Sequence, residues 1–129
     1  MDWQPLAEAA LDARRRSYSP YSRFAVGAAL LVGSGEIFTA SNVENRSYGL
    51  TLCAERIAAA SAVAGGHLDF VAIAVAAEGH PPARPCGMCL DTLAEFAPDL
   101  PVLLINTAGE HEELRLSDLL TQPFRFPVQ

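Results

Sequence analysis

The sequence predicts a three-layer α/β fold in which helices cover both faces of a mixed β-sheet. Stretches of helical length and periodicity alternate with short apolar runs rich in β-branched residues. A hairpin pattern near the N-terminus adds antiparallel strands to this alternation. The chain has 129 residues and no internal repeat, low-complexity block or long linker, so a single domain over residues 1–129 is expected.

The first half of the chain is expected to form a helix, a hairpin and a second helix. Residues 4–16 place apolar side chains at helical spacing and end in three arginines, which suit a helix C-terminus. Residues 24–35 and 36–43 are interpreted as two antiparallel strands joined at a Gly-Ser-Gly turn. Residues 52–64 are rich in alanine, contain neither Gly nor Pro and precede a Gly-Gly stop, which predicts a helix.

The second half is expected to alternate strands and helices. Residues 70–77 form a continuous apolar run, which predicts a central strand covered on both faces. Residues 87–97 predict a helix, and residues 101–106 predict another buried strand. Residues 117–124 are expected to contain a short terminal helix that begins at Ser117.

The composition argues against several classes of function. The net charge is −6, which disfavours a nucleic-acid polymer as partner, because nonspecific affinity for phosphates depends on clustered cations. All nine basic residues are arginine, and without lysine there is no Schiff-base chemistry through a lysine amine. No run approaches the roughly 20 apolar residues of a membrane span, and residues 1–16 do not resemble a secretory signal. A cytoplasmic protein without membrane contact is therefore expected.

Three cysteines and one glutamate form the most informative pattern. Cys53 lies where one predicted helix begins, and Cys86 and Cys89 lie where another begins. The spacing of Cys86 and Cys89 places both sulfurs on one helix face near the positive end of the dipole, which favours thiolate. A catalytic zinc site has three protein ligands and leaves the fourth position to water. Glu55 shares the first turn with Cys53 but points elsewhere, so we expect it to carry protons rather than bind the metal.

Arg56 is expected to compensate charge at this zinc site. Three thiolates give a divalent zinc ion an excess negative charge, which opposes ionisation of a bound water. Arg56 follows Cys53 by three residues on the same helix face, close enough to donate hydrogen bonds to sulfur. Its predicted task is to tune the acidity of the water.

Other interpretations of the cysteines remain open at this point. A lone CxxC also occurs in structural zinc sites, in redox pairs and as simple buried thiols. A structural site needs a fourth protein ligand, and His67, His80 and His111 all lack typical ligand spacing from a cysteine. A redox pair leaves Cys53 and Glu55 unexplained. A noncatalytic binding module stabilised by zinc is the alternative from a different functional class.

Three motifs in order resemble a known family. The stretches YSPYSRFAVGAALL, SNVENRSYGLTLCAERIAAASAV and PCGMC are similar to the small homotetrameric cytidine deaminases that use three cysteines for zinc. The resemblance runs from about Tyr18 to Phe124. It implies a cytidine deaminase-like fold, a role in pyrimidine salvage, and sites completed across the subunit interfaces of a homotetramer. It also implies that zinc is bound by Cys53, Cys86 and Cys89 and that Glu55 is the proton carrier.

The same resemblance implies the substrate contacts. Phe24 is expected to stack near the base, and Asn42 and Glu44 to hydrogen-bond the ribose, because an amide beside a carboxylate offers both donor and acceptor. The backbone around Ala54 is expected to contact the pyrimidine ring, and Phe124 to reach a neighbouring subunit's site. The implied reaction is hydrolytic deamination of cytidine and deoxycytidine to uridine and deoxyuridine, with release of ammonia.

Two positions depart from the family pattern. Leu90 directly follows the last cysteine, where members commonly have arginine, so a cation near the thiolates is missing and the demand on Arg56 rises. Arg46 stands where a small residue is usual, in a segment expected to reach toward a neighbouring active site. These departures keep a modified cytosine nucleoside open as the alternative substrate.

Overall fold

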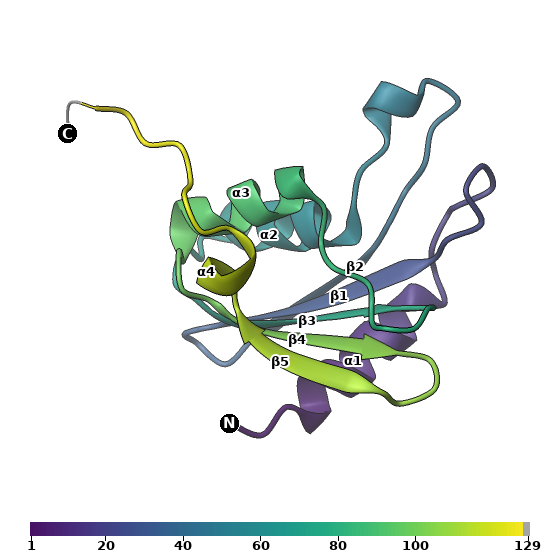
Figure 1. The fold of residues 1–129 in the computed structure, drawn as a ribbon, viewed down its shortest axis with the longest axis horizontal. Helices are drawn as coiled ribbons and strands as arrows, with labels where there is room; N and C mark the ends of the chain where they lie inside the picture. Colours follow the sequence, from purple (N-terminus) through teal and green to yellow (C-terminus); the bar gives the residue numbers. More distant parts are fainter. Residues whose placement is uncertain (128–129) are drawn as a thin grey trace.

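A five-stranded mixed sheet organises the computed structural model, which describes residues 1–127 (Figure 1). The strands lie in the order β2-β1-β3-β4-β5. Their bounds are Val26–Val32 (β1), Ile37–Ser41 (β2), Phe70–Ala77 (β3), Pro101–Asn106 (β4) and His111–Arg115 (β5). The helices are α1 (Gln4–Arg14), α2 (Ala54–Ala64), α3 (Gly87–Phe96) and α4 (Leu116–Leu119), with a 3-10 turn η1 at Tyr48–Leu50. The predicted domain, residues 1–129, includes Val128 and Gln129, which lie outside the described residues.

The centre of the sheet is β3, as its apolar sequence predicts. It pairs antiparallel with β1 on one side and parallel with β4 on the other, so the sheet is mixed. All of its residues except Val71 are buried. A strand buried on both faces needs no polar alternation, which explains why its sequence reads as a continuous apolar run.

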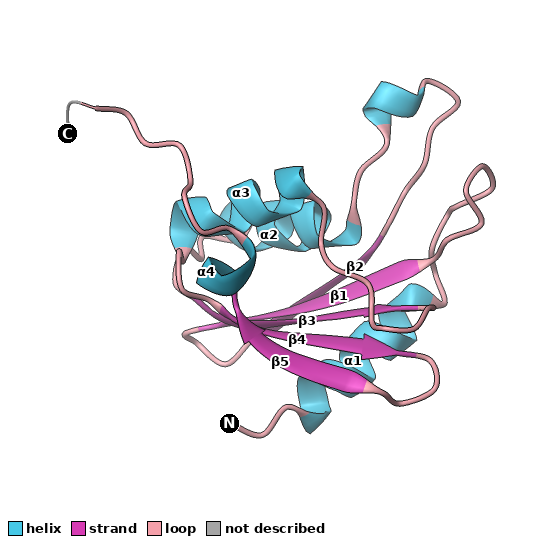
Figure 2. Cartoon of the chain, viewed as in Figure 1, coloured by secondary structure: helices cyan, strands magenta, loops and turns pink. Residues whose placement is uncertain are grey.

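Helices cover both faces of the sheet, which confirms the three-layer prediction (Figure 2). On one face, α1 packs Leu6 and Ala10 against the small side chains of β3. On the other face, α2 and α3 pack against the sheet in a second cluster that includes Ala58, Leu93 and Ile73. Alanine is frequent at both helix–sheet contacts, and its small side chain lets backbones approach closely.

Gly27 marks the closest approach between α1 and the sheet. A Cβ atom at this position would lie 2.1 Å from the carbonyl oxygen of Ala10 and 2.5 Å from the backbone nitrogen of Arg14. Neither atom can move without shifting the helix, so the position requires glycine. The contact places the end of α1, and the loop that follows it, against the start of β1.

Two parts of the C-terminal region differ from the sequence prediction. The helix α4 begins at Leu116, not at Ser117, and the Asp118 carboxylate accepts a hydrogen bond from the Arg115 backbone N–H over 2.9 Å. Ser117 instead donates to Asp99 Oδ1 over 2.6 Å. The edge strand β5 was not predicted, because its charged sequence alternates exposed and half-buried residues and contributes little to the core.

Two segments extend away from the body of the molecule. The arm formed by residues 42–52, which contains η1, projects beyond the end of the sheet, and the tail after α4 leaves the helical layer on another side (Figure 1). Both segments carry exposed apolar side chains, among them Tyr48, Leu50, Phe124 and Phe126. None of the helices in residues 1–127 is long and apolar enough to cross a membrane.

Candidate active site

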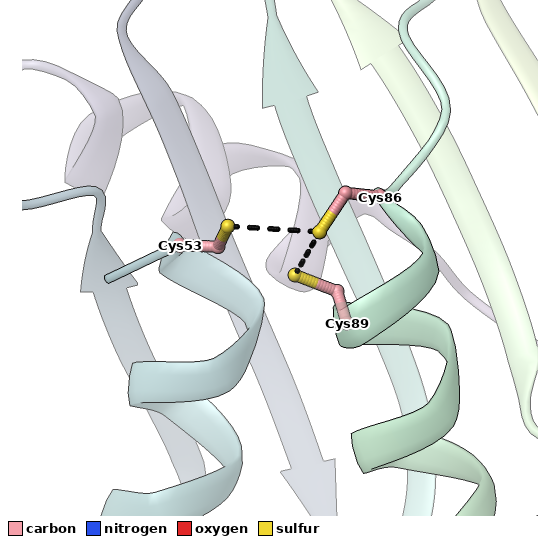
Figure 3. Close-up of side chains that lie close together, drawn as sticks. All are labelled: Cys53, Cys86 and Cys89. Atoms are coloured by element: carbon pink, nitrogen blue, oxygen red, sulfur yellow. Dashed lines mark hydrogen bonds between the residues drawn. The ribbon is translucent and has the colours of Figure 1, made fainter. Parts of the chain in front are cut away.

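The three cysteines converge between the starts of two neighbouring helices. Cys53 and Cys86 are the N-cap residues of α2 and α3, and Cys89 lies in the first turn of α3. Their side chains point toward one another (Figure 3). The Sγ atoms of Cys53 and Cys86 lie 3.7 Å apart, and those of Cys86 and Cys89 lie 3.2 Å apart. These distances are far longer than the roughly 2.05 Å of a disulfide bond, so the thiols are free.

The cluster fits a zinc ion. With Zn–S bonds of about 2.3 Å, tetrahedral geometry places neighbouring sulfurs about 3.8 Å apart. All three ligand atoms lie within 4.8 Å of one another, and no other group of three metal-binding side chains converges within residues 1–127. No histidine joins the cluster: His67 pairs with Glu36, and His80 pairs with Glu110. Three protein ligands suit a catalytic zinc site better than a structural one.

The electrostatics of the cluster favour a cation. Hydrogen bonds with Cys89 and Arg56 lower the pKa of Cys53 to about 5. For Cys89, the hydrogen bond with Cys53 and burial both raise the pKa of the thiol well above its ordinary range. Three neighbouring sulfurs therefore cannot all be thiolates without a positive ion among them. A coordinating divalent cation deprotonates such thiols outright, and the N-terminal dipoles of α2 and α3 add to the positive potential.

Glu55 is buried beside the cysteines. Its side chain belongs to the first turn of α2, and the residue is only 4 % exposed. Burial is the main cause that raises the pKa of Glu55 to about 7, and the negative charge of Cys53 adds to the effect. A carboxyl group with this pKa exchanges protons readily near neutral pH.

Arg56 reaches back from α2 to the cluster. Its Nη2 group donates to Cys53 Sγ at 3.7 Å and to the Thr51 carbonyl oxygen at 3.1 Å. Its Nε atom is buried and has no hydrogen-bond partner among the described residues. The thiolate of Cys53 raises the pKa of the Arg56 guanidinium, so this cation stays charged next to sulfur.

A short backbone ladder connects the arm to the residues that precede α2. Val43 pairs with Leu52 through two hydrogen bonds of 2.9 Å, and Tyr18 pairs with Val43 on the other side. The Val43–Leu52 bridge is antiparallel, so Asn42 lies opposite Cys53 and Glu44 lies opposite Thr51. The pairing connects the arm, the loop after α1 and the start of α2.

Asn42 and Glu44 hold the loop after α1 through their side chains. Asn42 Nδ2 donates to the Phe24 carbonyl at 2.8 Å, and its Oδ1 accepts the Val26 N–H at 2.9 Å. Glu44 Oε1 accepts the backbone N–H groups of Tyr21 and Ser22 at 2.9 and 3.1 Å. Both residues are more than nine-tenths buried. In addition to the contact with ribose that the sequence predicts, Asn42 and Glu44 therefore fix the conformation of the loop after α1.

One protein-family model matches most of the chain. Residues 2–104 match the family model described as the cytidine and deoxycytidylate deaminase zinc-binding region. The chain belongs to this deaminase family. The cysteine cluster lies within the matched region, and zinc is the metal that both the family and the three sulfurs specify.

Relatives in the deaminase family match almost the whole chain. A cytidine deaminase from Halalkalibacterium halodurans is 48 % identical over 125 residues, covering 96 % of this chain and 95 % of that protein. The crystal structure of a cytidine deaminase from Burkholderia pseudomallei has a TM-score of 0.92 and 46 % identity, and covers 96 % of this chain and all of that one. A blasticidin-S deaminase from Bacillus cereus is 39 % identical over 105 residues, covering 74 % of this chain and 73 % of that protein.

The remaining predicted contacts lie at different distances from the cysteine cluster. Ala54, the first residue of α2, is fully buried directly beside Cys53. Phe24 is 41 % exposed and is tied to Asn42 through its carbonyl group. Phe124 is 75 % exposed and stacks edge-on against Phe126 in the tail, at the wall of a 370 Å³ cavity that contains no cysteine. The single chain therefore does not bring Phe124 to the metal cluster.

The two positions that depart from the family pattern have different environments. Leu90 is 8 % exposed and belongs to the apolar cluster between the sheet and α2. Arg46 lies on the arm and lines a cavity of about 420 Å³ together with Tyr18, Tyr21 and Glu44. Arg56 is the only guanidinium within residues 1–127 that hydrogen-bonds a cysteine sulfur.

Sequence reasoning missed two polar residues of this site. Thr51 supplies the carbonyl that holds Arg56, and Ser22 donates its hydroxyl to the Glu44 carboxylate. Both line a cavity of about 330 Å³ with Tyr21, Glu44 and Tyr48. Ser22 lies 22 residues from Glu44, and Thr51 acts on Arg56 through its backbone carbonyl, so neither contact gave a signal in spacing or residue type.

Proposed function

We propose that this chain is a zinc-dependent hydrolase that deaminates cytidine and deoxycytidine to uridine and deoxyuridine. The observation that carries the proposal is the convergence of three thiols beside the buried carboxyl group of Glu55. A metal site with an adjacent proton carrier is what hydrolytic removal of an amino group requires. The nearly full-length relatives named cytidine deaminase support the choice of substrate.

In this proposal Cys53, Cys86 and Cys89 would hold the zinc ion, which would lower the pKa of a water molecule toward neutrality. Glu55 accepts a proton from the attacking water and delivers it to ring N3 of cytosine, while the water oxygen adds to C4. Glu55 then transfers the second proton to the amino group, the C4–N bond breaks and ammonia leaves. Burial of Glu55 keeps bulk water from competing for these protons.

The substrate contacts follow the sequence prediction. Phe24 stacks near the base, the backbone at Ala54 contacts the ring, and Asn42 and Glu44 bind the sugar. Arg56 offsets the charge of the thiolates, which would otherwise oppose ionisation of the water. The antiparallel Val43–Leu52 pairing places Asn42 opposite Cys53, which supports a single continuous nucleoside site.

The proposed enzyme is a homotetramer whose sites are completed by neighbouring subunits. Support comes from the arm and the tail, which extend from the body and expose aromatic side chains. Phe124 in the tail is the residue we assign to a neighbour's site. Three free thiols suit a reducing compartment, so we place the enzyme in the cytoplasm, where uridine formation belongs to pyrimidine salvage.

A modified cytosine nucleoside is the second candidate substrate. The observation that favours it is the relative named blasticidin-S deaminase, together with Arg46 at the edge of the cavity beside Glu44. A cation at Arg46 would favour a nucleoside that carries a negatively charged group, which cytidine lacks.

A substrate panel tests the proposal and ranks the two candidates. The purified zinc-loaded enzyme is given cytidine, deoxycytidine, 5-methylcytidine and blasticidin S in turn, and ammonia release is measured alongside the loss of cytosine absorbance. We expect kcat/KM to be highest, and similar, for cytidine and deoxycytidine. Negligible turnover of both with rapid turnover of either other compound would reverse the ranking.

A further inference from the structure

The side chain of Ser22 is the centre of a small hydrogen-bond network around Glu44. Its hydroxyl donates to Glu44 Oε2 and accepts the backbone N–H of Phe24 at 3.0 Å. The backbone N–H groups of Ser22 and Tyr21 occupy the other carboxylate oxygen. Three donors from one turn therefore fix the orientation of a single carboxylate.

The turn that presents these donors is held in an unusual backbone conformation. Arg23 has φ of +57°, in the left-handed region, and its N–H closes the turn onto the Ser19 carbonyl at 2.9 Å. A non-glycine residue is strained in this region, and such strain persists only where surrounding contacts fix it. The contacts that fix it here are those between the turn and Glu44.

A count of hydrogen-bonding capacity shows what remains for a ligand. A carboxylate has about four acceptor positions, and Glu44 uses three of them on Ser22 and Tyr21. Asn42 has two amide hydrogens and uses one on the Phe24 carbonyl, while its oxygen already accepts from Val26 and Ser17. One acceptor and one donor remain, which is what a single hydroxyl group satisfies.

The same network keeps Glu44 ionised. The hydrogen bond from Ser22 is the largest cause that lowers the pKa of Glu44, and the two backbone N–H groups act in the same direction. An ionised Glu44 only accepts hydrogen bonds and repels a phosphate. Ser22 also lines the 330 Å³ cavity beside Glu44, at the edge of the space where a ligand would lie.

We infer that Ser22 is a positioning residue for substrate recognition, which holds Glu44 so that one carboxylate acceptor remains for one sugar hydroxyl. The inference rests on the proposed function for the identity of the ligand. Ser22 also accepts the Phe24 N–H, but only its bond to Glu44 acts on a sugar hydroxyl. Loss of the Ser22 hydroxyl should therefore weaken the binding of nucleosides that carry the sugar hydroxyl more than the binding of those that lack it.

The test measures equilibrium binding of two nucleosides to the zinc-loaded enzyme by NMR titration. Uridine carries hydroxyls at C2′, C3′ and C5′, and 2′,3′-dideoxyuridine keeps only the one at C5′. We expect Ser22→Ala to raise the Kd of uridine about tenfold and to change the Kd of the dideoxy compound less than twofold. Ser22→Thr, which keeps the hydroxyl at an exposed position, should restore uridine binding.

Ser117→Ala is the matched control, because it also removes a hydroxyl that donates to a carboxylate, far along the chain at Asp99. It should leave both Kd values unchanged. An equal loss of affinity for both nucleosides in Ser22→Ala, or no loss for uridine, would overturn the role of Ser22.

A parallel assay of cytidine turnover separates this inference from the proposed function. Selective loss of uridine binding in an enzyme that does not deaminate cytidine would support the role of Ser22 and contradict the proposed reaction. Normal cytidine turnover without a selective loss of uridine binding would support the proposed reaction and contradict the role of Ser22. Absence of uridine binding in the unmodified enzyme would overturn the role of Ser22, and the turnover assay alone would decide the proposed reaction.

Discussion

Arg56 is the charged residue whose side chain is held most directly against the cysteine cluster. Its guanidinium lies against Cys53 Sγ, is anchored by the Thr51 carbonyl, and keeps one buried N–H without a partner among the described residues. Leu90, where a second cation is common in the family, is part of the apolar core instead. In the proposed enzyme, the compensation of thiolate charge therefore falls on a single side chain.

Replacement of Arg56 by alanine tests this assignment. Partners of metal ligands typically contribute tenfold to hundredfold to metal affinity or activity, and with no second cation we expect the upper end of that range. Zinc retention is measured by chelator competition, and kcat/KM by cytidine deamination. Arg15→Ala, which removes an exposed arginine from α1, is the control. Unchanged zinc affinity and kinetics in Arg56→Ala would remove Arg56 from the site.

Local spacing explains which residues could be predicted from the sequence. Cys53, Glu55 and Arg56 share one helical turn, and Cys86 and Cys89 share another, so helix geometry places each group without knowledge of the fold. Ser22 lies 22 residues from Glu44, and only the folded loop joins them. Spacing carries no information about such a contact.

The helices and strands could be predicted where burial sets their pattern. The runs that became β3 and β4 match the predicted ranges residue for residue, because strands at the centre of the sheet must be apolar on both faces. The edge strand β5 is held mainly by its pairing with β4, and its sequence HEELR gives no apolar run. Its formation depends on the neighbouring strand rather than on its own composition.

The loop after α1 and the arm show a second limit of local prediction. Both are irregular segments, and each is shaped by contacts with the other: Tyr18 with Val43, and Tyr21 with Tyr48 at a ring distance of 5.7 Å. The candidate sugar-binding residues lie where these segments meet. The sequence could indicate the residues through family resemblance, but not the network that orients them.

A single chain does not complete the proposed active site, because Phe124 lies away from the cysteines. Phe124 lies in a tail beyond α4, and within one chain it lines a cavity formed with α3 rather than the space beside the cysteines. If the tail completes a neighbour's site, catalysis in each site requires side chains from two subunits.

Mixed oligomers test completion between subunits. Phe124→Ala should lower kcat/KM about tenfold, as expected for loss of a base–aromatic contact, and Glu55→Gln should be nearly inactive. Co-expression with two different affinity tags gives oligomers that contain both chains. Some sites in them combine an intact Glu55 with an intact Phe124, so activity should exceed that of either parent oligomer.

Phe126→Ala, which removes the adjacent exposed aromatic, is the control and should retain activity. Mixed oligomers no more active than the average of their parents would place Phe124 outside the neighbouring site, as would full activity of Phe124→Ala alone.

In the proposed reaction, Glu55 moves the proton at a zinc site that activates water. The most direct test measures zinc content and cytidine turnover on the same preparations of the unmodified enzyme and Glu55→Gln. We expect about one zinc per chain in both proteins. In the variant, kcat should be lower by a factor of at least about 10³, because glutamine keeps the size of the side chain but cannot accept the proton. Equal turnover in the two proteins, at equal zinc content, would contradict it.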